Sequence, residues 1–135
     1  MKTVFVDTNV ILDVLLENEG LWEDSRKVYR LAELGYIQAF VSASSMTDIF
    51  YIARKKLTVP VARSAIEKLL SIFIVVGIDG DDLRGALTLP IDDMEDALQV
   101  WCAQKINAEA LLTNDRGGFA KLGEFAITPA DFVAL

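Results

Sequence analysis

Apolar and polar residues follow one another along this chain in two recurring patterns. Short apolar runs are followed by longer segments in which apolar residues return every three or four positions. The short runs predict buried β-strands, and the longer segments predict amphipathic helices. Strands are predicted at residues 3–6, 39–41, 72–76, 110–112 and 125–127. Helices are predicted at residues 9–16, 22–34, 44–56, 61–70, 81–87, 92–106 and 130–135.

The order of these elements predicts the fold class. Strands that alternate with helices favour an α/β fold of three α/β/α layers, with a central, mostly parallel sheet of four to five strands. No low-complexity linker or repeat of fixed period interrupts the pattern, and 135 residues are enough to form one hydrophobic core. A single domain that spans residues 1–135 is therefore expected.

Composition narrows the chemistry that the chain can perform. It has 13 Lys and Arg against 20 Asp and Glu, a net charge of -7, and no histidine. The charge argues against binding nucleic acid through bulk positive charge, and the lack of histidine excludes Ser-His-Asp catalysis and imidazole metal ligands. Cys102 is the single cysteine, and no apolar stretch of 18 residues is present. We expect Cys102 to be buried and the protein to be cytoplasmic, without membrane association.

The first candidate for a functional site is Asp7, which follows the apolar run Val4 to Val6 and precedes Thr8 and Asn9. This places a carboxylate at the carboxyl end of a predicted strand, where open α/β sheets bind their ligands. Helix capping is the alternative role, but Thr8 or Asn9 could perform it and leave the Asp7 carboxylate free. Thr8 and Asn9 are expected to fix the loop and not to contact a substrate.

Two further acids lie on predicted helices and away from the main apolar stripe. Asp48 falls nearly opposite the stripe that includes Met46, and it comes one turn after Ser45. Asp96 occupies a similar position on its helix, with Asp93 one turn before it. Either acid could be an ordinary surface residue, and acids near a helix start also stabilise the helix dipole. The apolar residues that follow each acid favour a half-buried cleft.

The fourth acid, Asp115, follows the predicted strand at residues 110–112, and an ordinary turn rich in Asn, Asp and Gly is the alternative there. Together the four acids occupy two strand ends and two helix starts, which can converge on one edge of a doubly wound sheet. Such carboxylates cannot crowd together without cations, and oxygen-rich clusters suit Mg²⁺ or Mn²⁺. A divalent ion can activate water for phosphodiester hydrolysis without a histidine.

Four ordered segments resemble the motifs of PIN-domain proteins, and in particular of VapC-type toxins from toxin-antitoxin pairs. The segments are Val4 to Leu12, Val41 to Ile49, Asp93 to Leu98 and Leu112 to Asp115, and the resemblance runs from the N-terminus to about Phe119. It implies a PIN-like fold and a Mg²⁺- or Mn²⁺-dependent endoribonuclease that cleaves RNA. Such proteins are often homodimers that a cognate antitoxin protein holds inactive.

The resemblance also implies roles for individual residues. The catalytic acids would be Asp7, Asp48, Asp96 and Asp115, with the metal held by Asp7, Asp96 and Asp115. The supporting polar residues would be Asn9, Ser45 and Thr113, and Asp93 is a further supporting candidate because it lies one turn before Asp96. Asp48 departs from the pattern, because glutamate is common at this position. We therefore expect a weaker or water-mediated contact between Asp48 and the metal, or a role as a base for the attacking water.

Binding of RNA also requires cationic side chains. Arg116, next to Asp115, is the residue predicted to contact an RNA phosphate, whereas Lys55 and Lys56 are expected at a solvated helix end. Two rival functions stay open. One is a non-catalytic PIN scaffold that binds RNA or a protein partner. The other is a haloacid-dehalogenase-like phosphatase, although that class usually carries a second Asp where this chain has Asn9.

Overall fold

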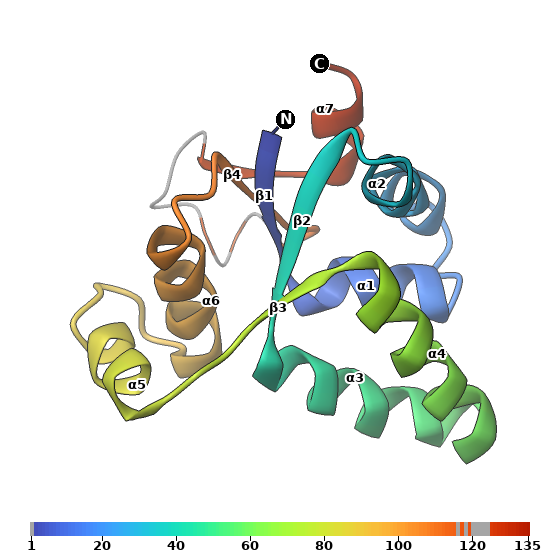
Figure 1. Cartoon of the computed structure of the whole chain (residues 1–135), viewed down its shortest axis with the longest axis horizontal. Coiled ribbons are helices and arrows are strands. Elements are labelled where there is room, and N and C mark those ends of the chain that lie inside the picture. The colour runs from blue at the N-terminus through green and yellow to red at the C-terminus, as the bar shows by residue number, and fades with distance from the viewer. Residues whose placement is uncertain (1, 116, 118, 120–124) are drawn as a thin grey trace.

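Five parallel strands form the centre of the computed structural model, which describes residues 2–115, 117, 119 and 125–135. Their order across the sheet is β3-β2-β1-β4-β5, so the first strand of the chain lies in the middle (Figure 1). The strands are β1 (Lys2–Val6), β2 (Ile37–Ser42), β3 (Ile74–Val76), β4 (Ala110–Leu112) and β5 (Ala126–Ile127). All four strand pairs are parallel, which confirms the predicted sheet.

The helices of the described chain cover both faces of the sheet and complete three layers (Figure 1). One face carries α1 (Thr8–Leu15), α2 (Trp22–Glu33), α3 (Ala43–Lys56), α4 (Val59–Ile72) and α7 (Pro129–Val133). The other face carries α5 (Gly80–Leu87) and α6 (Met94–Lys105). The strand predicted at residues 72–76 is shorter than expected, because α4 continues to Ile72 and β3 begins only at Ile74.

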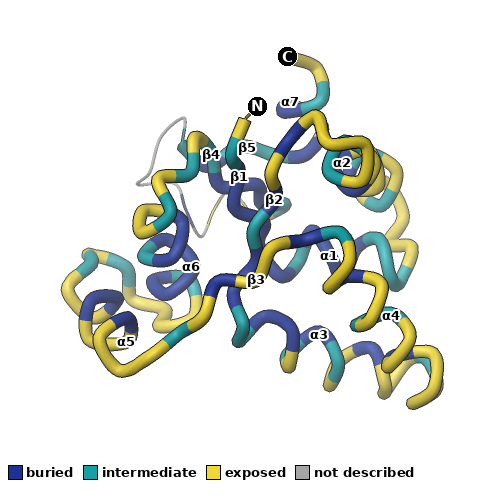
Figure 2. The backbone as a smooth tube through the Cα atoms, viewed as in Figure 1, coloured by how far each residue is buried: buried dark blue, intermediate teal, exposed yellow. Residues whose placement is uncertain are grey.

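Alternating side chains of the strands build a separate core on each face of the sheet. Val4 and Val6 belong to the core beneath α1 and α3, whereas Phe5 between them belongs to the core beneath α6. All three side chains are fully buried. Figure 2 shows this burial along the central strands and the inner sides of the helices. Because helices cover both faces, the ends of the strands are the exposed parts of the sheet.

One acid of the α5 and α6 pair differs from expectation. The sequence predicts a solvated helix cap for the acid run Asp79 to Asp82, and Asp79 does cap α5. Asp82, however, is only 5% exposed. The backbone N–H of Asp79, the indole of Trp101 (3.0 Å) and the ammonium of Lys105 (3.1 Å) donate to its carboxylate and lower its pKa to about 2. Asp82 therefore anchors α5 to α6.

Two expectations from composition can be compared with the fold. Cys102 is fully buried on α6, as predicted, and burial raises the pKa of its thiol to about 11. None of the helices in the described part of the chain combines the length and the apolar composition needed to cross a membrane.

Candidate active site

Asp7 stands at the carboxyl end of the central strand β1. Its backbone N–H donates to the Leu112 carbonyl of β4 at 2.9 Å, so the sheet itself holds the residue. Asp7 occupies the N-cap position of α1, but its side chain makes no capping hydrogen bond. The carboxylate instead accepts a hydrogen bond from Thr113 Oγ1 at 2.8 Å. The side chain is thus held by the loop that follows β4.

Burial makes the Asp7 carboxylate costly to ionise. The residue is 6% exposed, and loss of solvent raises its pKa from 3.8 to about 6. The hydrogen bond from Thr113 opposes this rise, whereas the negative charge of Asp96 adds to it. A cation near both carboxylates would remove much of this penalty.

Asp96 lies in the first turn of α6. Asp93 caps this helix, because its carboxylate accepts the backbone N–H of Asp96 at 2.9 Å. Partial burial raises the pKa of Asp96 to about 6, and the charges of Asp93, Asp115 and Glu95 contribute to the rise. Asp93 therefore acts on Asp96 through its charge and through the helix backbone.

The other two predicted acids lie around the same helix start. Asp48 is half-buried on α3, and its charge adds to the effect of burial in raising the pKa of Glu95. Asp115 is exposed after β4, and its backbone N–H donates to Thr113 Oγ1 at 2.9 Å. Its charge acts on Asp96. Each of the four predicted acids thus lies on the first turn of α6 or within electrostatic range of it.

The chemistry of these donors suits a hard cation. Mg²⁺ and Mn²⁺ prefer carboxylate oxygens, and the repulsion between Asp7 and Asp96 would fall beside a positive charge. Within the described residues, however, no group of three or more His, Cys, Asp or Glu side chains is arranged so that it could hold a metal ion. The ligand set Asp7, Asp96 and Asp115 therefore stays a prediction.

Asn9 and Thr113 connect the loops that follow β1 and β4. Thr113 is fully buried, and its Oγ1 accepts a hydrogen bond from Asn9 Nδ2 at 3.4 Å. Asn9 Oδ1 accepts the backbone N–H of Asn114 at 3.2 Å. These two residues, predicted to be supporting, thus join the loop of Asp7 to the loop of Asp115. Arg116, the predicted phosphate contact, lies outside the described residues.

Ser45 belongs to a buried polar network, formed by Thr8, Ser42, Ser45 and Gln99, that the sequence did not reveal. Gln99 Nε2 donates to Ser45 Oγ at 2.9 Å and to Thr8 Oγ1 at 3.3 Å. The hydroxyl oxygens of Thr8 and Ser45 are 2.7 Å apart, and those of Ser42 and Ser45 are 2.8 Å apart. Gln99 Oε1 has no hydrogen-bond partner among the described protein groups. No local pattern could reveal these contacts, because Gln99 is 54 residues from Ser45 and 91 from Thr8.

Asp13 is a second polar residue that the sequence did not reveal. It lies on α1, is 6% exposed, and accepts hydrogen bonds from Asn114 Nδ2 and, at 2.7 Å, from Asn18 Nδ2. Asn114 also donates to Ser25 Oγ at 3.2 Å. Asp13 therefore fixes the residue that precedes Asp115. The one available signal was an acid inside an otherwise apolar helical segment.

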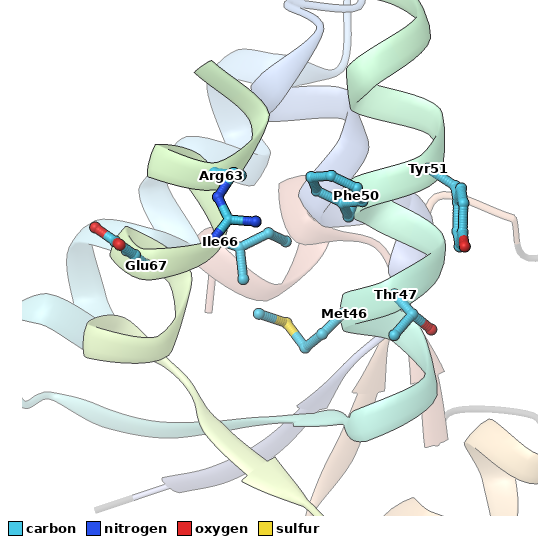
Figure 3. Close-up of a pocket in the computed structure, with 7 residues that line it drawn as sticks. All are labelled: Met46, Thr47, Phe50, Tyr51, Arg63, Ile66 and Glu67. Atoms are coloured by element: carbon cyan, nitrogen blue, oxygen red, sulfur yellow. The ribbon is translucent and has the colours of Figure 1, made fainter. Parts of the chain in front are cut away.

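A cavity of about 410 Å³ opens between α3 and α4 (Figure 3). Met46 and Phe50 of α3 point toward Ile66 of α4, and Arg63 and Glu67 add charges on the α4 side. The lining in the described chain includes none of the four predicted acids. This cavity is therefore distinct from the acidic edge of the sheet.

The sequence also favours a surface for a dimer or a partner on these two helices, at Ile49-Phe50-Ile52 and Leu69-Leu70. Ile49 and Leu69 are buried in the core, with exposed fractions of 0% and 1%. Ile52 and Leu70 are 38% and 53% exposed. Phe50 is half-buried, so the accessible part of the predicted patch is smaller than expected.

The chain is an α/β/α protein with a parallel sheet in the order β3-β2-β1-β4-β5. Acidic residues lie around the carboxyl end of its central strand. Comparison with known proteins gives the family. Residues 3–117 match the family model described as PIN domain, and the chain belongs to this family.

The chain is also similar to individual proteins. It is 25% identical over 124 residues to Ribonuclease VapC1 of Aquifex aeolicus (strain VF5), which covers 88% of this chain and 85% of that protein. Its fold is similar to DNA-bound VapBC from Salmonella typhimurium, with a TM-score of 0.74 at 16% identity over 96% of this chain and 99% of that chain. A toxin-antitoxin complex from Klebsiella pneumoniae gives a TM-score of 0.69 at 21% identity over 93% and 97%. The predicted PIN-like fold is confirmed.

Proposed function

We propose that the protein is a Mg²⁺- or Mn²⁺-dependent endoribonuclease of the VapC toxin type, which hydrolyses phosphodiester bonds in RNA. The observation that carries the proposal is the buried Asp7 carboxylate at the carboxyl end of β1, which lies within electrostatic range of Asp96 at the start of α6. Membership of the PIN domain family and the similarity to Ribonuclease VapC1 support the same activity.

The acids would have different roles in the reaction. Asp7, Asp96 and Asp115 would hold the ion, and the hydrogen bond from Thr113 would keep the Asp7 carboxylate in place. The ion, when bound, supplies a Lewis acid that activates water and offsets charge on the phosphate. Asp48, half-buried on α3, would orient the water or accept its proton. Arg116 would contact an RNA phosphate.

We also propose a cognate antitoxin as the protein partner, a homodimer as the assembly and the cytoplasm as the location. The similarity to a toxin-antitoxin complex supports the first. The exposed apolar residues Ile52 and Leu70 support the second. A free, buried Cys102 supports a reducing compartment.

A non-catalytic PIN scaffold is the second candidate function. It is favoured by the lack of a three-acid group that could hold a metal among the described residues, and by the shorter acid at position 48. A haloacid-dehalogenase-like phosphatase is no longer a candidate, because the chain belongs to the PIN domain family.

RNA cleavage by purified variants separates the enzyme from the scaffold. We expect Asp7→Asn and Asp96→Asn proteins to remain folded but to lose Mn²⁺-dependent cleavage down to the level seen with a chelator. Asp81→Asn is the matched control, because Asp81 is 86% exposed and pairs only with Arg84 among the ion pairs of the described chain. Unchanged cleavage by both site variants would contradict the proposal.

A further inference from the structure

Gln99 is a buried polar residue to which the proposed reaction gives no role. It is 1% exposed in the middle of α6, and it is the amide of the buried polar network. The network joins side chains at the start of α1 and α3 to a residue in the second turn of α6. Three segments that are far apart in the sequence are thus tied at one point.

Thr8, Ser45 and Gln99 each lie close in the sequence to one predicted acid. Thr8 follows Asp7 directly at the start of α1. Ser45 precedes Asp48 by three residues on α3, and Gln99 follows Asp96 by three residues on α6. Residues three apart on a helix lie on the same side, one turn from each other. A shift of Thr8, Ser45 or Gln99 would therefore move the neighbouring carboxylate relative to the other two.

Gln99 is the member that connects α6 to the hydroxyl groups of Thr8 and Ser45. Its Nε2 has two N–H groups, and each reaches a different hydroxyl, Ser45 Oγ and Thr8 Oγ1. Gln99 Oε1 has no partner among the described residues, so the amide is held by its donor side alone. An apolar side chain of similar size would fill the space without the unpaired oxygen, but it could not hold the two hydroxyls.

We propose that Gln99 is a positioning residue, whose amide ties the second turn of α6 to the starts of α1 and α3 and so fixes the relative positions of the helix starts near Asp7, Asp48 and Asp96. The inference rests on the proposed nuclease function, because it assigns these three acids to one site. Gln99 does not contact the substrate or the ion. It acts through the hydroxyls of Thr8 and Ser45.

The direct test compares Gln99→Leu with Gln104→Leu, a control on the exposed side of the same helix. We expect Gln99→Leu to lower kcat for RNA cleavage by about 10-fold to 100-fold, as outer residues of metal sites do. KM for RNA should stay within about threefold, because the variant leaves substrate contacts intact. Both assays are run well below the melting temperature of each variant.

A second readout does not depend on turnover. Calorimetric titration with Mn²⁺ alone, without RNA, should give a dissociation constant about 10-fold or more higher for Gln99→Leu than for Gln104→Leu. A residue that only fills the core would lower the melting temperature and leave Mn²⁺ affinity unchanged. Equal Mn²⁺ affinity and equal kcat in the two variants would therefore overturn the proposal.

Ser45→Ala provides an independent variant if Gln99→Leu does not fold, since it removes one hydroxyl and leaves the amide in place. The network predicts that Ser45→Ala weakens Mn²⁺ binding in the same direction. In a folded double variant the two losses in kcat should not multiply, because the residues act as a unit. Independent losses, or Mn²⁺ affinity unaffected by Ser45→Ala, would count against the network.

The failure of this inference can be told apart from the failure of the proposed function. If wild-type protein binds Mn²⁺ but cleaves no RNA, the nuclease proposal is wrong, and weaker Mn²⁺ binding by Gln99→Leu still supports the positioning role. If the wild type cleaves RNA and Gln99→Leu matches Gln104→Leu in both assays, only the positioning role is wrong.

Discussion

Ionisation of Asp7 at neutral pH destabilises the metal-free fold. Burial raises the pKa of this carboxyl from 3.8 to about 6, and the charge of Asp96 adds to the rise. Between these pH values the native state binds more protons than the unfolded state, so stability falls as pH rises through this window. The penalty is absent below the lower value and complete above pH 6. A bound cation would relieve this penalty, because it would offset the negative charge of the buried carboxylate.

Asp7→Asn should therefore stabilise the metal-free protein at neutral pH. A rise from 3.8 to about 6 corresponds to about 3 kcal/mol, and we expect the free energy of unfolding at pH 7.5 to increase by about 1–3 kcal/mol. Denaturant unfolding in a chelator measures it, with Asp81→Asn as the exposed control. The gain should disappear near pH 4. A variant less stable than wild type at pH 7.5, or a gain independent of pH, would disprove this reading of Asp7.

The same residue shows how far a sequence can predict a site. Asp7 was found because it ends an apolar strand before a helix, which is a local pattern. Gln99 and Asp13 were missed because their partners come from distant parts of the chain. The burial of Asp82 was not predicted for the same reason, since its hydrogen-bond partners Trp101 and Lys105 lie on another helix. Local periodicity predicts elements and strand ends, whereas buried polar contacts depend on the packing between elements.

At the scale of elements, α5 packs against α6 on one face of the sheet. Gly85 of α5 lies against Trp101 of α6 so closely that an added Cβ would be 2.2 Å from the indole. The indole in turn donates to Asp82 at 3.0 Å. Close approach of the two helices therefore requires glycine at this position.

Gly85→Ala should destabilise the protein by about 1–3 kcal/mol, because overpacking outweighs the better helix propensity of alanine. Gly77→Ala is the matched control, since an added Cβ there meets no atom within 4 Å. Thermal unfolding of the two variants measures the difference. RNA cleavage below the melting temperature should be equal in both. If Gly85→Ala were as stable as the control, the tight packing of α5 on α6 would be wrong.

At the scale of the whole molecule, strand order explains why Asp7 lies beside the loop that follows β4. The sequence predicts a parallel sheet, but it does not predict that β1 lies beside β4 in the order β3-β2-β1-β4-β5. This pairing joins Asp7 to the loop of Thr113 and Asp115. The net charge of -7 then opposes the approach of RNA, so divalent ions at the acidic edge would serve both chemistry and binding.

Metal-dependent RNA cleavage is tested most directly by the rate of cleavage of a labelled RNA by the wild-type protein across a Mn²⁺ titration. We expect no cleavage in chelator, a saturable increase with Mn²⁺, and full reversal when chelator is added back. Cleavage that persists in excess chelator, or folded protein that leaves RNA intact at every Mn²⁺ and Mg²⁺ concentration, would contradict a metal-dependent nuclease.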